Sequence, residues 1–248
     1  MGKRNALGER PMNTLLAAKS HDSVQGSEES DDQNIRIVPM EKEHARGAVE
    51  MHLLAFRGFF LASLGRGFLH QFYRAAAGHK ETVGFVALRG GEVIGACFGL
   101  VNARDFYSQL LKKRWWIFGL YCIGPVLRRP GIIPRLLRAR KHESHPPSLS
   151  IHPLGALQST AVHPSCQGKG VAIGLMRAVC HEYARRGVHA VYLTTDADRN
   201  EMVRGFYKAM GWKFIGYYTT PEGRRMCWYL WLDPALRWNS ESIPSPKE

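Results

Sequence analysis

The sequence has no apolar run of the roughly 18 residues that a helix needs to cross a bilayer, and its longest candidate, residues 115–126, is too short. Its first twenty residues hold no continuous apolar core, so we expect no secretory signal there. Cysteine is scarce, with five residues in no paired spacing. We therefore expect reduced thiols in a cytoplasmic protein, and neither a disulfide framework nor a zinc site.

Repeats are also absent, since the 25 glycines follow no period, and this excludes collagen-like and solenoid architectures. The chain does have 248 residues, of which 45% are hydrophobic and 10% aromatic, enough for a substantial core. Residues 1–34 differ, because the polar run SHDSVQGSEESDDQ buries too little apolar surface to offset the entropy cost of ordering. We expect a disordered tail at 1–34 and a second tail at 235–248.

Acidic residues are scarce between residues 102 and 150. This stretch holds ten lysines and arginines against Asp105 and Glu143, and so carries more than half of the net charge of +13. A concentrated basic block indicates an anionic ligand, a nucleic acid or a membrane surface. Four prolines between 125 and 146 predict an irregular insertion over 102–153, with no long helix and only a short one over 135–141.

Hydrophobic periodicity predicts the element order β α α β β, the insertion, and then β α β α β β. The expected strands are 35–40, 82–89, 92–101, 154–164, 189–196, 213–220 and 225–232, and the expected helices are 45–56, 64–76, 167–187 and 200–211. Gly90-Gly91 lies between two β-rich runs, as in a hairpin. Adjacent hairpins mixed with helices predict an α/β (α+β) fold that is not doubly wound.

The most informative segment is QGKGVA at 167–172, between a predicted strand and a predicted helix. A helix N-terminus presents unpaired N–H groups and a partial positive charge, which suit an anion. Gly168 and Gly170 have no Cβ and would let a diphosphate approach the backbone, and Lys169 adds a cation. The segment is not a Walker A loop, and Ile173 stands where a dinucleotide fingerprint has its third glycine. An ordinary glycine-softened turn stays open as the alternative.

This segment resembles the GNAT superfamily of acyl-CoA-dependent N-acyltransferases, whose signature is [Q/R]-x-x-G-x-[G/A]. Gln167, Gly170 and Ala172 match it, after the lead-in A-V-H-P at 161–164. The family's second signature, N-x-x-A-x-x-F-Y-x-x-x-G-[F/W], is matched at Asn200, Phe206, Tyr207, Gly211 and Trp212, with Val203 in place of its small residue. The resemblance implies a GNAT domain over 35–234. Its sheet would be mixed and mostly antiparallel, flanked by helices, with the basic insertion between its third and fourth strands.

The resemblance also implies the cofactor site. In the family the central strand pairs with the pantetheine amides of acetyl-CoA, and the matching positions here are Thr160, Ala161 and Val162. The pyrophosphate would be held by backbone N–H groups of Gln167, Gly168, Lys169, Gly170, Val171 and Ala172. Asn200 would lie at the cofactor and also suits a helix cap.

Tyr207 matches the family's general acid. A tyrosine with a reference pKa near 10 is protonated at neutral pH and can donate a proton to the leaving thiolate. The Val162 N–H would stabilise the oxyanion. The alternative for Tyr207 is a core aromatic beside Phe206, and Cys166 reads as an incidental thiol, with no base paired to it in the sequence.

The general base stays open. Many family members use a glutamate on the central strand, where this sequence has Ala156 and Gln158, and neither titrates. The remaining candidates are a water chain, His152, His163, Glu182 and Asp196. A strong base is less necessary if the acceptor amine has a lowered pKa, as on an amino sugar.

The implied function is an N-acetyltransferase that moves an acetyl group from acetyl-CoA to a primary amine of a small acceptor, with no metal. The alternative is a non-catalytic acyl-CoA-binding or membrane-docking protein on the same fold. We expect the insertion to be a substrate lid first and a peripheral membrane contact through 102–150 second. No nucleic-acid motif is present, so no nucleic-acid partner is expected. The acceptor, the acyl-chain preference and the choice between monomer and homodimer stay open.

Overall fold

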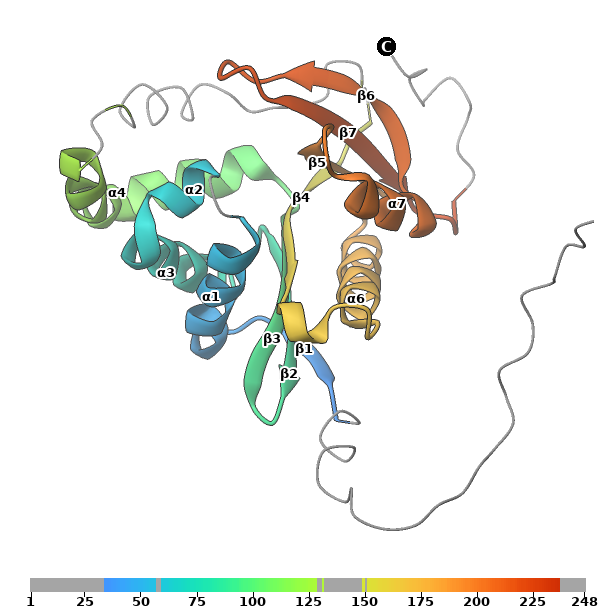
Figure 1. Cartoon of the computed structure of the whole chain (residues 1–248), viewed down its shortest axis with the longest axis horizontal. Coiled ribbons are helices and arrows are strands. Elements are labelled where there is room, and N and C mark those ends of the chain that lie inside the picture. Colours follow the sequence, from blue (N-terminus) through green and yellow to red (C-terminus); the bar gives the residue numbers. More distant parts are fainter. Residues whose placement is uncertain (1–33, 57–58, 129–130, 132–148, 150, 237–248) are drawn as a thin grey trace, which may run out of the picture.

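The computed structural model describes residues 34–56, 59–128, 131, 149 and 151–236 (Figure 1). Nearly all of the two expected tails, and the short helix expected over 135–141, lie outside these residues.

One seven-stranded sheet forms the centre of the molecule, in the order β1-β2-β3-β4-β5-β7-β6. The strands are β1 (Arg36–Pro39), β2 (Thr82–Arg89), β3 (Glu92–Leu100), β4 (Leu154–Val162), β5 (Ala190–Asp196), β6 (Lys213–Thr219) and β7 (Arg225–Leu232). Neighbouring strands are antiparallel except β4 and β5, which are parallel. The expected mixed, mostly antiparallel sheet is confirmed, and so is the hairpin at Gly90-Gly91, where both residues have positive φ.

Helices cover both faces of the sheet (Figure 1). One side holds η1 (Lys42–His44), α1 (Ala45–Ala55), α2 (Phe60–Ser63), α3 (Gly65–Ala76) and α4 (Ala103–Arg128); the other holds α6 (Val171–Arg185) and α7 (Glu201–Ala209), with η2 (Pro164–Cys166) before α6. Each side has its own hydrophobic core, because alternate residues of a strand point to opposite faces. On β3, for example, Cys97 belongs to the α6 core and Phe98 to the α1–α3 core.

Tyr183 fixes α6 against the middle of the sheet. Its buried hydroxyl donates to the carbonyl oxygens of Leu100, at 3.2 Å, and Ala156, at 3.0 Å. Gly99 of β3 and Gly155 of β4 make room for the ring, since a Cβ on either glycine would overlap Tyr183. The C-terminal end of α6 is thereby held against β3 and β4.

The structure contradicts the expectation of an irregular insertion directly after β3. Residues 103–128 form α4, two helical segments that meet in a kink at Arg114, where the backbone angles are not helical, and Pro125 lies inside the second segment. Proline removes one N–H donor and disfavours a helix interior, so the prolines led us to exclude a long helix, which was wrong. Packing outweighs this penalty, because Phe106 and Phe118 are buried and the Phe118 ring lies 5.0 Å from that of Phe68 on α3.

Candidate functional site

The parallel strands β4 and β5 pair along only part of their length. Their pairing begins at Leu154 with Ala190 and ends at Leu157 with Leu193. β4 nevertheless continues to Val162 and β5 to Asp196. Beyond Leu157 and Leu193 the two strands no longer pair, and we call the unpaired stretch between their ends the opening.

A bulge in β4 explains the loss of pairing. Phe98 of β3 pairs with Ser159, and the next residue, Gly99, pairs with Leu157, so that Gln158 is an extra residue in β4. A β-bulge bends its strand and increases the local twist. Residues 159–162 consequently present a backbone edge that does not pair with β5.

The structure places Thr160, Ala161 and Val162 on this unpaired edge, as the resemblance implied for the pantetheine site. The N–H of His163 donates to the carbonyl of Ile94 on β3, at 2.8 Å. Successive backbone amides of a strand point in opposite directions. The N–H of Val162 therefore points away from β3, into the opening.

The glycine turn follows directly and leads into α6. Gly168 and Gly170 have φ values of 79° and 78°, in the left-handed region that favours glycine. Residues 167–170 are exposed, and a Cβ on either glycine would meet no atom within 4 Å. The first N–H groups of α6 have no intrahelical acceptor, as at any helix start. The expected anion site is thus an open turn at a helix N-terminus.

Tyr207 reaches back from α7 to the unpaired edge. Burial raises the pKa of Tyr207 well above its usual value of 10; the nearby Cys97 thiol adds to this rise and a side-chain hydrogen bond with Thr160 opposes it. The Thr160 Oγ1 lies 3.2 Å from the Cys97 Sγ. Tyr207, Thr160 and Cys97 form a cluster, called the tyrosine cluster below, on the α6 side of β4. The Tyr207 phenol is protonated at neutral pH.

Tyr207 is also part of the hydrophobic core. Its side chain is buried, and its ring centroid lies 6.0 Å from that of Trp212 and 5.9 Å from that of Tyr229. The core reading and the acid reading therefore describe different parts of one side chain, the ring and the hydroxyl.

Asn200 stands before the first residue of α7, but its side chain makes no capping hydrogen bond, so that part of the prediction was wrong. Its Nδ2 donates instead to Thr195 Oγ1, at 2.8 Å, and to the carbonyl of Asp196, at 3.2 Å. Asn200 thus ties the start of α7 to the end of β5, beside the opening. Its contact with a cofactor stays a prediction.

Glu182, one candidate for the general base, lies near the end of α6 that is far from the glycine turn. Arg185 and Arg186 hold its carboxylate at 2.6 and 2.7 Å. Hydrogen bonding to Arg185 is the largest cause that lowers the Glu182 pKa, to about 2. A carboxylate held in this way is a poor proton acceptor, so Glu182 is an ion-pair partner of the two arginines and not a suitable general base.

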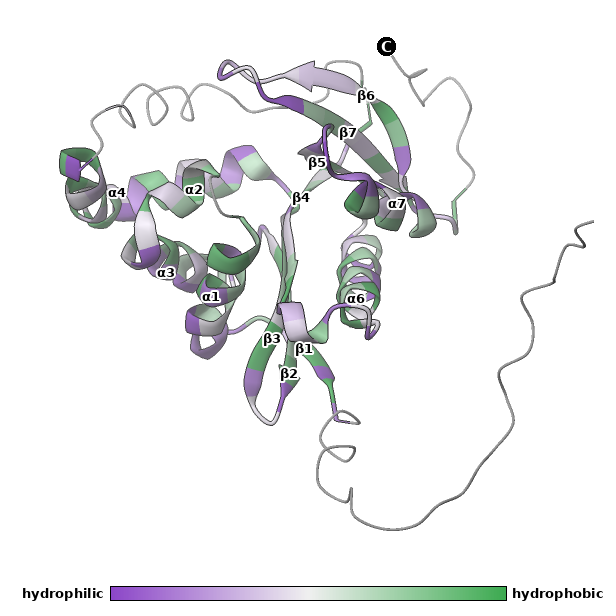
Figure 2. Cartoon of the chain, in the orientation of Figure 1, coloured by the Kyte–Doolittle hydropathy of each residue, from purple (hydrophilic) through white to green (hydrophobic). Residues whose placement is uncertain are grey.

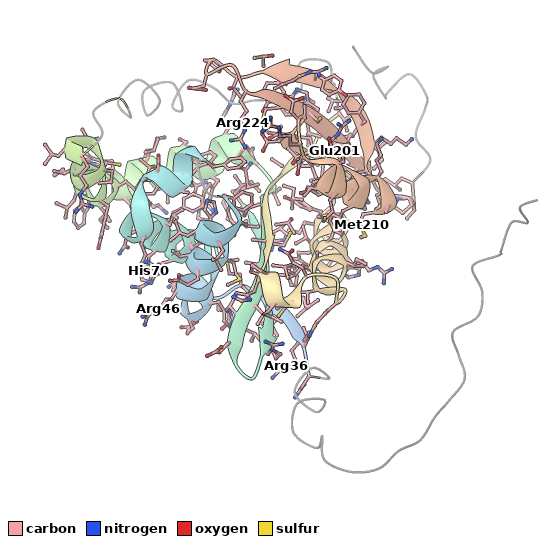
Figure 3. The ribbon with its side chains drawn as sticks, in the orientation of Figure 1. Arg36, Arg46, His70, Glu201, Met210 and Arg224 are labelled. Atoms are coloured by element: carbon pink, nitrogen blue, oxygen red, sulfur yellow. The ribbon has the colours of Figure 1, made fainter. Side chains whose placement is uncertain are left out.

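Asp196 is placed at the opening, at the end of β5, but it is paired with Arg224. The Arg224 guanidinium also lies 3.9 Å above the centre of the Phe59 ring. Arg224, labelled in Figure 3, therefore joins the β6–β7 turn to the segment before α2. The two histidine candidates flank β4. His152 is exposed and precedes β4, and the His163 Nδ1 lies 2.8 Å from Ser165 Oγ in the segment after β4.

A second polar cluster, called the histidine cluster below, was not predicted from the sequence. His52 Nδ1 of α1 lies 3.0 Å from Tyr73 Oη of α3, which lies 3.4 Å from Ser159 Oγ of β4. The His52 Nε2 is buried, and it has no hydrogen-bond partner among the described residues. Burial lowers the pKa of His52 to about 4, so the ring is neutral at neutral pH.

A signal for this cluster was present in the sequence. His52 and Tyr73 both occupy apolar-face positions of their predicted helices, and polar groups at such positions need partners. The partner Ser159 directly precedes Thr160, so the two clusters lie on opposite faces of β4 at its unpaired edge.

Comparison with known proteins agrees with this geometry. The profile of the acetyltransferase (GNAT) family matches residues 147–212. An N-acetyltransferase from Staphylococcus aureus aligns with a TM-score of 0.51 and 12% identity, over 81% of this chain and 99% of its own. A Drosophila melanogaster polyamine N-acetyltransferase that forms N-acetylagmatine aligns with a TM-score of 0.50 and 11% identity, over 80% of this chain and 100% of its own.

A comparison with curated protein sequences found no match. The structural likenesses, at such low identity, show the fold alone. The family match is more specific, because it spans β4, the glycine turn, α6, β5 and α7, where the opening and the tyrosine cluster lie. Residues 147–212 of this chain therefore match the GNAT family of acetyltransferases.

Proposed function

We propose that this protein transfers an acetyl group from acetyl-CoA to a primary amine of a small acceptor. One observation carries the proposal: the unpaired edge of β4 leads directly into the open glycine turn, with the Tyr207 hydroxyl beside that edge. The β4 edge suits the extended pantetheine chain, the glycine turn suits the pyrophosphate, and the Tyr207 hydroxyl supplies a proton donor beside them.

The donor would be bound by backbone groups. The pantetheine amides would pair with residues 159–162, as an added strand does. The pyrophosphate would bind the N–H groups at the start of α6, where the helix dipole favours negative charge. Lys169, exposed on the turn, adds positive charge there. These contacts would aim the thioester at the part of the opening beside Thr160 and Val162.

The acceptor would reach the thioester carbon as a neutral amine. Its attack forms the carbon–nitrogen bond and a tetrahedral oxyanion, and the inward-pointing Val162 N–H would donate a hydrogen bond to that oxygen. The attacking nitrogen, now positively charged, releases one proton to solvent, and collapse of the intermediate breaks the carbon–sulfur bond. The Tyr207 hydroxyl would then give its proton to the departing thiolate and regain one from solvent.

The histidine cluster suggests the side from which the acceptor arrives. It lies on the face of β4 opposite the tyrosine cluster, and the His52 Nε2 offers a buried nitrogen to a ligand. A ring whose pKa is about 4 is a weak base for an alkylammonium ion. The site therefore suits an amine of lowered pKa, such as that of an amino sugar, because a larger fraction of such an amine is neutral before it binds.

Thiol release from acetyl-CoA over a panel of polyamines and amino sugars tests the function. The proposal predicts acetyl-CoA binding and amine-dependent thiol release. Binding without release for any amine would favour the alternative, a non-catalytic acyl-CoA-binding protein. The domain limits of 35–234 and the cytoplasmic location stay predictions.

A further inference from the structure

The second half of α4 presents a row of large apolar side chains to solvent. Trp116, Leu120, Ile123 and Leu127 are 60%, 61%, 53% and 78% exposed. Their spacing of four, three and four residues places them along one face of the helix. We call these four residues the outer stripe.

The opposite face of the same helix is also apolar, and it is already used. Phe118 and Cys122 are buried, and they pack against Phe68 and Leu64 on the α2–α3 side. A helix with apolar side chains on both faces usually has an apolar neighbour on each of them. The fold covers one face of α4 and leaves the outer stripe in contact with water, which marks an interaction site.

The charges around the stripe indicate which partner covers it. Lys112, Lys113 and Arg128 are exposed at the two ends of this half-helix. Residues 106–128 contain four lysines and arginines and no aspartate or glutamate. Aromatic residues beside cations suit the boundary between lipid headgroups and acyl chains. A second copy of the chain fits worse, because joining two such faces would bring like charges together.

The geometry allows contact along the surface of a bilayer. Figure 1 shows this half of α4 at the end of the molecule farthest from α6, and Figure 2 shows strongly hydrophobic and strongly hydrophilic residues on it. Of the helices within the described ranges, none is long and apolar enough to span a membrane. A helix lying in the interface would leave the glycine turn open to solvent.

We propose that α4 docks this protein onto an anionic lipid surface. The outer stripe would insert at the headgroup boundary, and Lys112, Lys113 and Arg128 would contact lipid phosphates. The proposal does not depend on acetyl transfer, because it concerns surface chemistry at a distance from the glycine turn.

Flotation of the full chain with vesicles tests the proposal. We expect co-flotation with phosphatidylcholine vesicles that contain phosphatidylglycerol, and much less with phosphatidylcholine alone. Binding should fall with added salt, and by roughly fivefold for each of Lys112→Ala and Lys113→Ala. The double variant W116S and L120S should lower binding by at least about tenfold.

Met202→Ser is the matched control, because Met202 is 87% exposed on α7, away from the stripe. It should float as the unchanged protein does. The proposal would be overturned by an unchanged protein that fails to float, or by a stripe variant that floats as well as the control. A dimer that the stripe variant converts to a monomer, with no vesicle binding, would assign the stripe to a second copy and would also overturn it.

Discussion

The helices α6 and α4 both rest on neighbouring elements through an apolar face, but they differ in what they show to solvent. The outer side of α6 includes the exposed residues Arg177, His181 and Arg185, whereas the outer side of α4 carries the apolar outer stripe. In α6 the groups without a partner in the helix are the N–H groups at its N-terminus, and in α4 they are the apolar side chains along one flank. A helix end with unpaired N–H groups suits an anion, and an unpaired apolar flank suits a lipid surface or a partner.

The two ends of α6 give the sharpest test of this comparison. Gly170→Glu should abolish CoA binding, because a side chain at φ +78° is strained and its charge opposes the pyrophosphate. Calorimetric titration with CoA measures the loss. Gly187→Glu is the matched control, since Gly187 has φ +75° at the other end of α6 and an added Cβ there also meets no atom within 4 Å. Equal CoA binding by both variants would contradict the assignment of the pyrophosphate site to the glycine turn.

Tyr207→Phe should lower kcat by about a hundredfold, because it removes the proton donor and keeps the ring. The affinity for CoA should change little. Tyr229→Phe is the control, since Tyr229 is buried next to Tyr207. Because burial raises the Tyr207 pKa above 10, kcat of the unchanged enzyme should show no alkaline loss from this group below about pH 10. A Tyr207→Phe enzyme as fast as the control would remove the acid role.

His52→Phe tests the other face of β4 through stability. The folded-state pKa of about 4 lies below the usual histidine value of 6.5, so the unfolded chain binds the proton first as the pH falls. Stability should therefore decline from pH 6.5 to pH 4, by about 2–3 kcal/mol from this group. Denaturant unfolding should show that His52→Phe lacks this share of the decline.

The same substitution separates the two substrates. His52→Phe should raise KM for the amine and leave CoA affinity unchanged, because the histidine cluster lies on the opposite face of β4 from the tyrosine cluster. A variant with weakened CoA binding and an unchanged amine KM would contradict the proposal that the amine approaches β4 from the face of the histidine cluster.

Tyr183→Phe has the smallest expected effect and tests how α6 is anchored. The loss of the buried hydroxyl, whose one hydrogen is shared between the carbonyls of Leu100 and Ala156, should cost about 1–3 kcal/mol of stability. Urea unfolding measures the cost. W116S, which changes an exposed side chain of α4, should leave stability nearly unchanged. A larger loss for W116S than for Tyr183→Phe would reverse the contrast between the two helices.

Local patterns explain what the sequence could predict. The hairpin at Gly90-Gly91 and the succession from β4 to α7 depend on turn residues and periodicity within short windows. The glycine turn was found for the same reason, since Gly168 and Gly170, on either side of Lys169, mark two positions of positive φ within one short segment.

Tertiary packing explains what the sequence could not predict. α4 persists through Pro125 because Phe118 packs on Phe68, a contact between residues fifty positions apart. The bulge at Gln158 shows only in the register between β3 and β4. The histidine cluster joins three separate elements, and no local window contains His52 together with Ser159.

Amide hydrogen exchange with and without CoA tests the central claim most directly. We predict that CoA protects the amides of Thr160 and Val162 on β4 and those of residues 171–173 at the start of α6, and leaves the Gly187 end unchanged. Tight CoA binding that leaves these amides unprotected, or that protects another region instead, would contradict the account.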